Sequence, residues 1–177
     1  MIFKRYPHNP PHLFVDGTYY FITAGSYEKR ILFYDDDRKQ ILLKAIQVWL
    51  EKYKWTLEAW IIFGNHYHIM TCSKRGEDLP QIIQRIHGRS ATLLNKLDYQ
   101  LGRQVWWNYW DTCIRGEKDY FARLNYLFWN AVKHAMVPEP EAYQWSSFHQ
   151  YVETFDTANL NKYHAEIELI KDIFDDF

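Results

Sequence analysis

The order of secondary-structure signals most constrains the fold of this chain. A turn signal, Gly64-Asn65, separates two runs rich in β-branched and aromatic side chains, and this pattern predicts a β-hairpin. Stretches with apolar residues near helical spacing flank the hairpin, and a further strand signal lies outside each of them. The predicted strands cover residues 18–25, 55–63, 66–72 and a run within 103–115, and the predicted helices cover residues 36–53 and 79–97. The order β-α-β-β-α-β predicts an α+β, ferredoxin-like fold built on an antiparallel sheet.

An additional helix is predicted over residues 117–136, after the last strand. Its apolar residues recur at spacings of three and four, so we expect this face to pack on the side of the sheet that the first two helices leave uncovered. The opposite stripe carries Arg123, Tyr126, Asn130 and Lys133. A tyrosine and an asparagine therefore share one polar face, one helical turn apart.

The length of 177 residues fits a single domain with a sizeable core. We expect residues 1–16 to form an N-terminal arm and residues 138–177 to form a C-terminal tail with an acidic end. Within the tail, aromatic side chains predict an ordered segment at residues 143–151, and a short helix is predicted from about residue 163 to residue 174.

Charge is distributed unevenly along the chain. From residue 153 onward there are seven acidic and two basic side chains, a net charge of −5, and since the whole chain carries −1, residues 1–152 carry +4. A mildly basic body is compatible with phosphate binding without a large electrostatic surplus. The chain has no run of about 18 apolar residues, and its first residues lack the apolar centre of a signal peptide. We therefore expect a cytoplasmic protein that does not enter a membrane.

Two histidines flank one bulky residue in the second strand of the predicted hairpin. Alternate residues of a strand share a face, so His66 and His68 point the same way and make half of a metal site. An amide or a carboxylate from a nearby helix would complete a three-ligand site that can polarise a phosphate, and Asn130 is a candidate for it. Tyr126, one turn before Asn130, would be a phenol nucleophile beside that site.

These residues also allow simpler interpretations. An isolated His-x-His pattern on a strand is often structural. Tyr120 competes with Tyr126 as nucleophile, although a leucine, not an amide, stands four residues after Tyr120. Asn130 is equally compatible with a surface position or a helix cap.

Three collinear motifs resemble those of single-tyrosine HUH transposases, in which HUH denotes histidine-hydrophobic-histidine. The segment EAWIIFGNHYHIM resembles the histidine strand of the family, which includes the small insertion-sequence transposases. The segment WWNYWDTCIRGEKDYFARLNYLFWNAVKHAMV is similar to the strand and tyrosine helix with a Tyr-x-x-x-Asn-x-Val-Lys-His pattern. The later YQWSSFHQY resembles the Trp-Ser-Ser-aromatic segment of the REP-associated tyrosine transposases.

The resemblance implies a role for each motif residue. His66 and His68 would bind the metal ion, with Asn130 as third ligand, and Tyr126 would be the nucleophile. The implied activity is cleavage and strand transfer of hairpin-bearing single-stranded DNA through a 5′-phosphotyrosine, with Mg²⁺ or Mn²⁺ and without ATP. Relatives act as monomers or homodimers, so the resemblance leaves the oligomeric state open.

Five basic residues are candidate DNA contacts. Lys4 and Arg5 belong to the arm, which could read unpaired bases, and Arg85 and Arg89 lie in the second helix, which could contact the DNA backbone. Lys133 could contact a phosphate. A solvated helix face, and the favourable position of a cation near a helix C-terminus, explain the helix residues equally well.

Two further functions remain compatible with the sequence. A non-catalytic nucleic-acid-binding module could use the same sheet as an aromatic platform. A small-phosphoester metal hydrolase could use water in place of tyrosine as the nucleophile.

Overall fold

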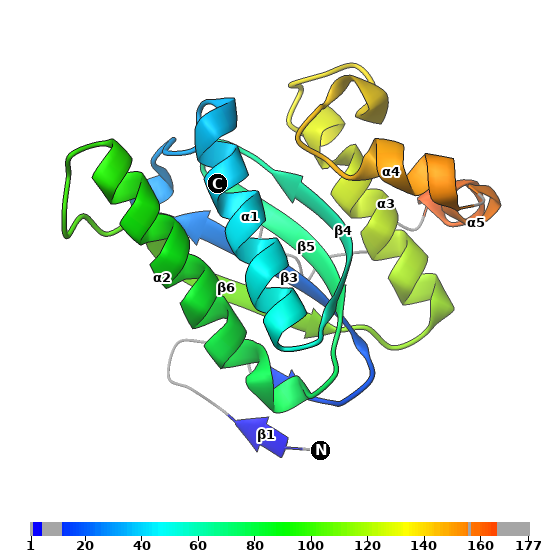
Figure 1. Cartoon of the computed structure of the whole chain (residues 1–177). Coiled ribbons are helices and arrows are strands. Elements are labelled where there is room, and N and C mark those ends of the chain that lie inside the picture. Colours follow the sequence, from blue (N-terminus) through cyan, green and yellow to red (C-terminus); the bar gives the residue numbers. More distant parts are fainter. Residues whose placement is uncertain (1, 5–11, 156, 166–177) are drawn as a thin grey trace.

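The predicted antiparallel sheet forms the centre of the protein, in a computed structural model that describes residues 2–4, 12–155 and 157–165 (Figure 1). Its strands are β3 (Tyr19–Ser26), β4 (Thr56–Ile62), β5 (His66–Cys72) and β6 (Trp106–Cys113). Neighbouring strands are antiparallel and their spatial order is β4-β5-β3-β6. α1 (Asp36–Lys52) follows β3, and α2 (Leu79–Leu97) follows β5. This topology confirms the ferredoxin-like fold.

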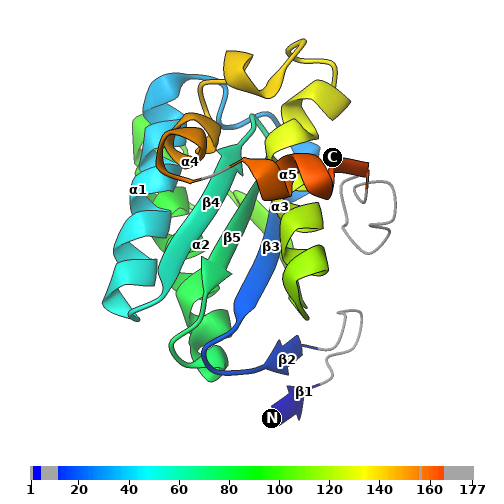
Figure 2. The same cartoon turned by 90° about the vertical axis from the view of Figure 1, so that its right-hand side faces the viewer.

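Separate hydrophobic layers lie on the two faces of the sheet. α1 and α2 lie across one face and α3 (Glu117–Lys133) lies on the other (Figures 1 and 2). Alternate strand residues divide accordingly: in β3, Tyr20 and Ile22 belong to the core under α1 and α2, whereas Phe21 belongs to the core under α3. The additional helix therefore covers the face on which the sequence predicted it.

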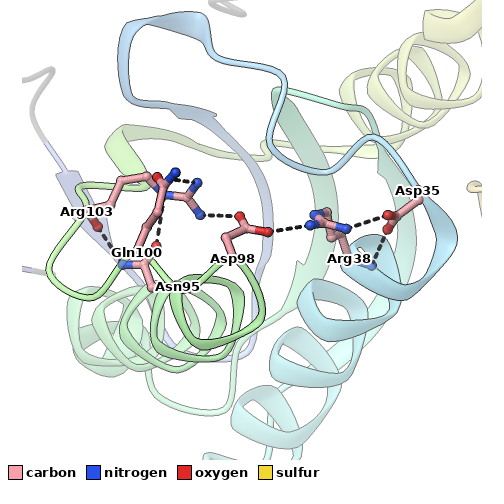
Figure 3. Close-up of polar contacts among 6 residues, drawn as sticks. All are labelled: Asp35, Arg38, Asn95, Asp98, Gln100 and Arg103. Atoms are coloured by element: carbon pink, nitrogen blue, oxygen red, sulfur yellow. Dashed lines mark hydrogen bonds and ion pairs between the residues drawn. The ribbon is translucent and has the colours of Figure 1, made fainter.

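A network of charged groups joins the start of α1 to the end of α2 (Figure 3). Asp35 caps α1 by accepting a hydrogen bond from the backbone nitrogen of Arg38 at 2.9 Å. The Arg38 guanidinium pairs with Asp98 at the C-cap of α2, and Arg103 Nη2 donates to Asp98 at 2.7 Å. Burial opposes ionisation of Asp98, but the hydrogen bonds from Arg103 and Arg38 outweigh it and lower the pKa of Asp98.

α3 is buried on more sides than its sequence pattern predicted. Arg123, Tyr126 and Asn130 lie on the stripe that we expected to face away from the core, yet each is at most 5% exposed. That expectation was wrong because this stripe faces the sheet: the centroids of the Tyr126 and Phe21 rings are 6.0 Å apart, and the Arg123 guanidinium lies 6.0 Å from the centroid of the same Phe21 ring. Other sides of α3 are covered by α4 (Phe148–Thr154) and α5 (Ala158–Lys162), whose apolar side chains join the same core. Lys133, at the end of the stripe, is exposed as expected.

The tail after α3 packs against the edge strand β4. α3 ends at Lys133, earlier than predicted, and Ala135 adopts a left-handed φ of 53°. Further on, Ser147 N donates to Trp60 O at 2.9 Å, and the Ser147 hydroxyl accepts from Trp60 N at 2.9 Å. These bonds confirm the ordered segment at residues 143–151. The helix predicted from residue 163 to 174 falls largely outside the described residues.

The beginning of the chain forms a small ribbon that the sequence did not predict. β1 (Ile2–Lys4) pairs antiparallel with β2 (His12–Phe14). Nδ1 of His12 contacts the Asp111 carboxylate, which ties β2 to β6. Short 3₁₀ helices occur at η1 (Tyr27–Lys29), η2 (Gly76–Asp78) and η3 (Pro140–Ala142). Among the described residues, no helix has the length and apolar character needed to cross a membrane.

Candidate active site

His66 and His68 lie side by side at the start of β5, on the face of the sheet that α3 covers. Their ring centroids are 5.2 Å apart and both side chains are buried. Tyr67 points to the opposite face, where its hydroxyl lies 3.0 Å from Nε2 of His87 on α2. Burial keeps His87 neutral by lowering its pKa to about 3. The shared orientation of the two strand histidines is thereby confirmed.

The ring orientation of each histidine is set by a contact at Nδ1. The Thr23 hydroxyl on β3 lies 2.7 Å from His68 Nδ1, and Asn65 Oδ1 lies 2.9 Å from His66 Nδ1. Phe63 also stacks on the His66 ring, with centroids 4.4 Å apart. In metal sites, a hydrogen bond at one imidazole nitrogen fixes the ring so that the other nitrogen can bind the ion. In this arrangement Nε2 is the nitrogen through which each ring would bind a metal ion.

α3 brings Tyr126 and Asn130 to the histidine pair. The Tyr126 ring lies 5.9 Å from the His68 ring, and the His134 ring, just past the end of α3, lies 5.5 Å from the His66 ring. Asn130 lies four residues from both Tyr126 and His134 and is fully buried. Because residues four apart share a helix face, Asn130 lies between the two groups that contact the histidines. The four residues predicted to form the site therefore converge.

Lys133 contacts Tyr126 directly. Its Nζ donates a hydrogen bond to the Tyr126 hydroxyl at 3.0 Å and lies 4.8 Å from the centroid of the Tyr126 ring. The sequence predicted a phosphate contact for this lysine. The structure places its ammonium group on the oxygen that would act as the nucleophile.

Tyr120 occupies a different environment from Tyr126. Its ring packs edge-on against Tyr19 at 4.9 Å, near the start of β3. Burial, followed by the neighbouring Glu58 carboxylate, raises the pKa of Tyr120. Of the two tyrosines considered as nucleophiles, Tyr126 is the one that contacts a histidine of the pair.

The donor set suits a divalent ion whose remaining ligands are oxygens. Two imidazoles and one amide oxygen supply three donors and no negative charge, so an ion bound there keeps positive charge for a phosphate. Within the described residues, no group of three His, Cys, Asp or Glu side chains is placed to hold a metal ion. The resemblance to the transposase motif implies that the amide of Asn130 would be the third ligand.

Two of the other predicted DNA contacts, both on α2, lie away from this site. Arg85 and Arg89 are exposed on α2, on the opposite face of the sheet. The Arg85 guanidinium lies 5.6 Å from the ring centroid of Trp49 on α1. Lys4 belongs to β1 by its backbone, and Arg5 lies outside the described residues.

Sequence reasoning did not identify two neighbours of the site. Thr23 and Phe63 contact the histidines, but only the strand register and the turn geometry reveal this. His134 is the last residue of the Tyr-x-x-x-Asn-x-Val-Lys-His pattern and continues the helix stripe four residues after Asn130, so the sequence did mark it.

Comparisons with known proteins agree with this architecture. The family described as "Transposase IS200 like" matches residues 14–113, a range that includes the histidine pair and ends before α3. A REP-associated tyrosine transposase of Escherichia coli (strain K12) is 22% identical over 141 residues, which cover 78% of this chain and 81% of the relative. The structure of a REP-associated tyrosine transposase bound to a REP hairpin has the same fold, with a TM-score of 0.69 at 21% identity, covering 85% of this chain and 86% of the other.

The fold and the matched family define a protein of the transposase class. Within that class, the chain belongs to the IS200-like transposase family.

Proposed function

We propose that the protein is a metal-dependent DNA transposase that cleaves and rejoins hairpin-bearing single-stranded DNA through a covalent 5′-phosphotyrosine intermediate. The observation that carries the proposal is the position of Tyr126, whose ring lies 5.9 Å from the His68 ring. A phenol beside a metal-binding pair can attack a phosphodiester. The REP-associated relative and the structural neighbour that was solved with a REP hairpin support hairpin DNA as the substrate class.

The chain's own residues account for the chemical step. The Tyr126 oxygen would attack phosphorus, and the bond from phosphorus to the 3′-oxygen would break, which leaves a DNA 3′-hydroxyl and transfers the phenol proton to that oxygen or to solvent. Attack by another 3′-hydroxyl on the phosphotyrosine would reverse the step and join strands. Lys133 would stabilise negative charge on the Tyr126 oxygen in both directions. A Mg²⁺ or Mn²⁺ ion bound by His66, His68 and Asn130 would neutralise charge on the phosphate oxygens.

A covalent-adduct assay tests the proposal. The protein is incubated with a labelled pool of single strands that carry a hairpin stem and randomised unpaired flanks, with Mn²⁺ or with EDTA. We expect a denaturation-resistant protein–DNA band in the presence of Mn²⁺ and no such band in the presence of EDTA. Tyr126→Phe should lose the band, while the matched variant Tyr120→Phe should keep it. A band that persists in Tyr126→Phe would refute the nucleophile assignment.

The same assay separates the two alternative functions. If the protein binds the hairpin equally well with and without EDTA and forms no adduct, it is a nucleic-acid-binding module. Metal-dependent hydrolysis of a small phosphoester, without adduct or hairpin binding, would identify a hydrolase. His66→Gln should lose the adduct but keep hairpin binding, since the metal would serve chemistry more than docking.

We further propose that one copy of the chain contains a complete cleavage site, because Tyr126 and the histidine pair meet within a single chain. A mixture of Tyr126→Phe and His66→Gln proteins should then form no adduct. Restored adduct formation in the mixture would show that the tyrosine acts on the site of a second copy.

A further inference from the structure

Apart from the candidate active site, a pocket lies on the α3 side of the sheet, near the start of α3. It has a volume of about 620 Å³ and is formed by the start of β3, by β4, and by the facing sides of α3 and α4. Three tyrosines line it, namely Tyr19, Tyr120 and Tyr151, together with the half-buried carboxyl group of Glu58. The alternative nucleophile considered from the sequence, Tyr120, is thus a wall of this pocket.

The walls of the pocket are aromatic and hold one acid between them. Tyr120 packs edge-on against Tyr19 at 4.9 Å, and Tyr151 lies 4.9 Å from Phe155, which is 54% exposed at the rim. Glu58 lines the same pocket as all three tyrosines, and burial, followed by the Glu58 carboxylate, raises the pKa of each of them. Burial in turn raises the pKa of Glu58.

The charge of the pocket argues against a phosphate as its ligand. Besides Glu58, the lining includes the carboxylate of Glu117, and none of the lining residues is a lysine or arginine. A nucleobase fits this chemistry better, because any base can stack on aromatic rings. A carboxylate accepts hydrogen bonds from an exocyclic amino group, as Glu and Asp do from cytosine N4.

The pocket is close enough to Tyr126 to take part in the same reaction. Tyr120 and Tyr126 are six residues apart on one helix, which corresponds to about 9 Å along its axis. Tyr19 stands two residues, or roughly 7 Å, before Phe21 on the same face of β3, and the Phe21 ring lies 6.0 Å from the Tyr126 ring. Since stacked nucleotides advance about 3.4 Å each, this separation spans on the order of one to three nucleotides.

We propose that this pocket receives one unpaired nucleobase within a few nucleotides of the cleaved phosphate, and that Glu58 selects a base with an exocyclic amino group over thymine. The inference rests on the proposed function, since it assumes that Tyr126 attacks DNA. Tyr19 and Tyr120 supply stacking surfaces, and Glu58 accepts from the amino group. Thymine presents carbonyl oxygens where the other bases present that group, so it is disfavoured.

Sequencing of covalently captured DNA tests the proposal. The pool with randomised flanks is treated with the full chain and Mn²⁺, and the adduct-borne and unreacted strands are sequenced, so that every unpaired position receives a base preference. For the wild type, we expect one position within a few nucleotides of the cut at which thymine is depleted about fivefold or more. Glu58→Gln should abolish this depletion at that position alone, because an amide can also donate to thymine.

Two controls make the result decisive. Glu153→Gln removes an equal charge from an exposed position of α4 outside the pocket lining and should leave the preference unchanged. An abasic substitution at the selected position should slow adduct formation by the wild type, a test that needs no protein variant. Adduct formation with no thymine depletion, or with depletion that survives in Glu58→Gln, would overturn the base pocket while leaving the proposed transposase intact. Absence of any adduct would overturn both.

Discussion

The contact between Thr23 and His68 gives a direct test of whether His68 binds the metal ion. Thr23→Val keeps the shape of a buried side chain but removes the hydroxyl that lies 2.7 Å from His68 Nδ1. Loss of a buried hydrogen bond costs about 1–3 kcal/mol. Loss of the outer partner of a ligating histidine lowers metal affinity by roughly 10–100-fold. Because about 1.4 kcal/mol corresponds to a factor of ten, the two magnitudes agree.

The measurement is the Mn²⁺ concentration that gives half-maximal adduct formation. In Thr23→Val it should rise by about 10–100-fold, while the rate at saturating Mn²⁺ changes far less. Thr71→Val is a matched control, because Thr71 is a buried β5 threonine that donates to Thr56 O at 2.7 Å. Thr71→Val should lower the stability of the fold by about as much as Thr23→Val does, without changing the Mn²⁺ concentration needed for half-maximal adduct formation. A folded Thr23→Val protein with an unchanged requirement would refute the role of His68 as a ligand.

Four further substitutions test other parts of the structure. Lys133→Gln should slow single-turnover adduct formation by about fivefold to tenfold while hairpin affinity is retained, because a charge-assisted hydrogen bond to Tyr126 is lost from an exposed site. Asp98→Asn should lower the free energy of unfolding by about 1–2 kcal/mol at neutral pH. Since the folded-state pKa of Asp98 is lowered, the contribution of its carboxylate to stability is present above the unfolded pKa of about 4 and is lost as the pH falls. Denaturant melts should therefore show a smaller difference in stability between the wild type and Asp98→Asn in acid. Gly76→Ala brings a Cβ against the backbone nitrogen of Val15 and should lower the stability of the fold by about 1–3 kcal/mol, as measured in thermal melts. In the middle of α2, the Cβ added by Gly88→Ala would meet nothing within 4 Å, so this substitution should increase the stability of the fold by about 0.5–1 kcal/mol.

Local patterns predicted the elements of the sheet and of its first face. The hairpin was readable because its turn residues and β-prone runs are adjacent in sequence, and β5 begins at His66 as predicted. The spacing of apolar residues predicted α2 over the range that it occupies, Leu79–Leu97. The ferredoxin-like order then followed from the alternation of strands and helices.

Long-range pairing could not be read in the same way. The proximity of Thr23 to His68 depends on the register of β3 against β5, which joins residues 45 apart. The Tyr126 stripe is buried because it meets Phe21 on β3 and His68 on β5, while α4 and α5 pack against other residues of α3. A periodicity rule assigns one buried face to a helix and therefore fails where neighbours enclose it on several sides. The β1–β2 ribbon was missed because strands of three residues carry little pattern.

The candidate site is part of the core under α3, and this determines how its residues should be tested. Phe63 stacks on His66, and Phe21 lies 5.5 Å from His68, so both imidazoles are packed like core side chains. Truncation of such a ring to alanine leaves a cavity that destabilises the protein by itself. A lost adduct in His66→Ala would then have two explanations, whereas His66→Gln retains most of the side-chain volume. The same packing holds the rings in position before DNA binds, so the contacts that confound an alanine substitution are those that preorganise the site.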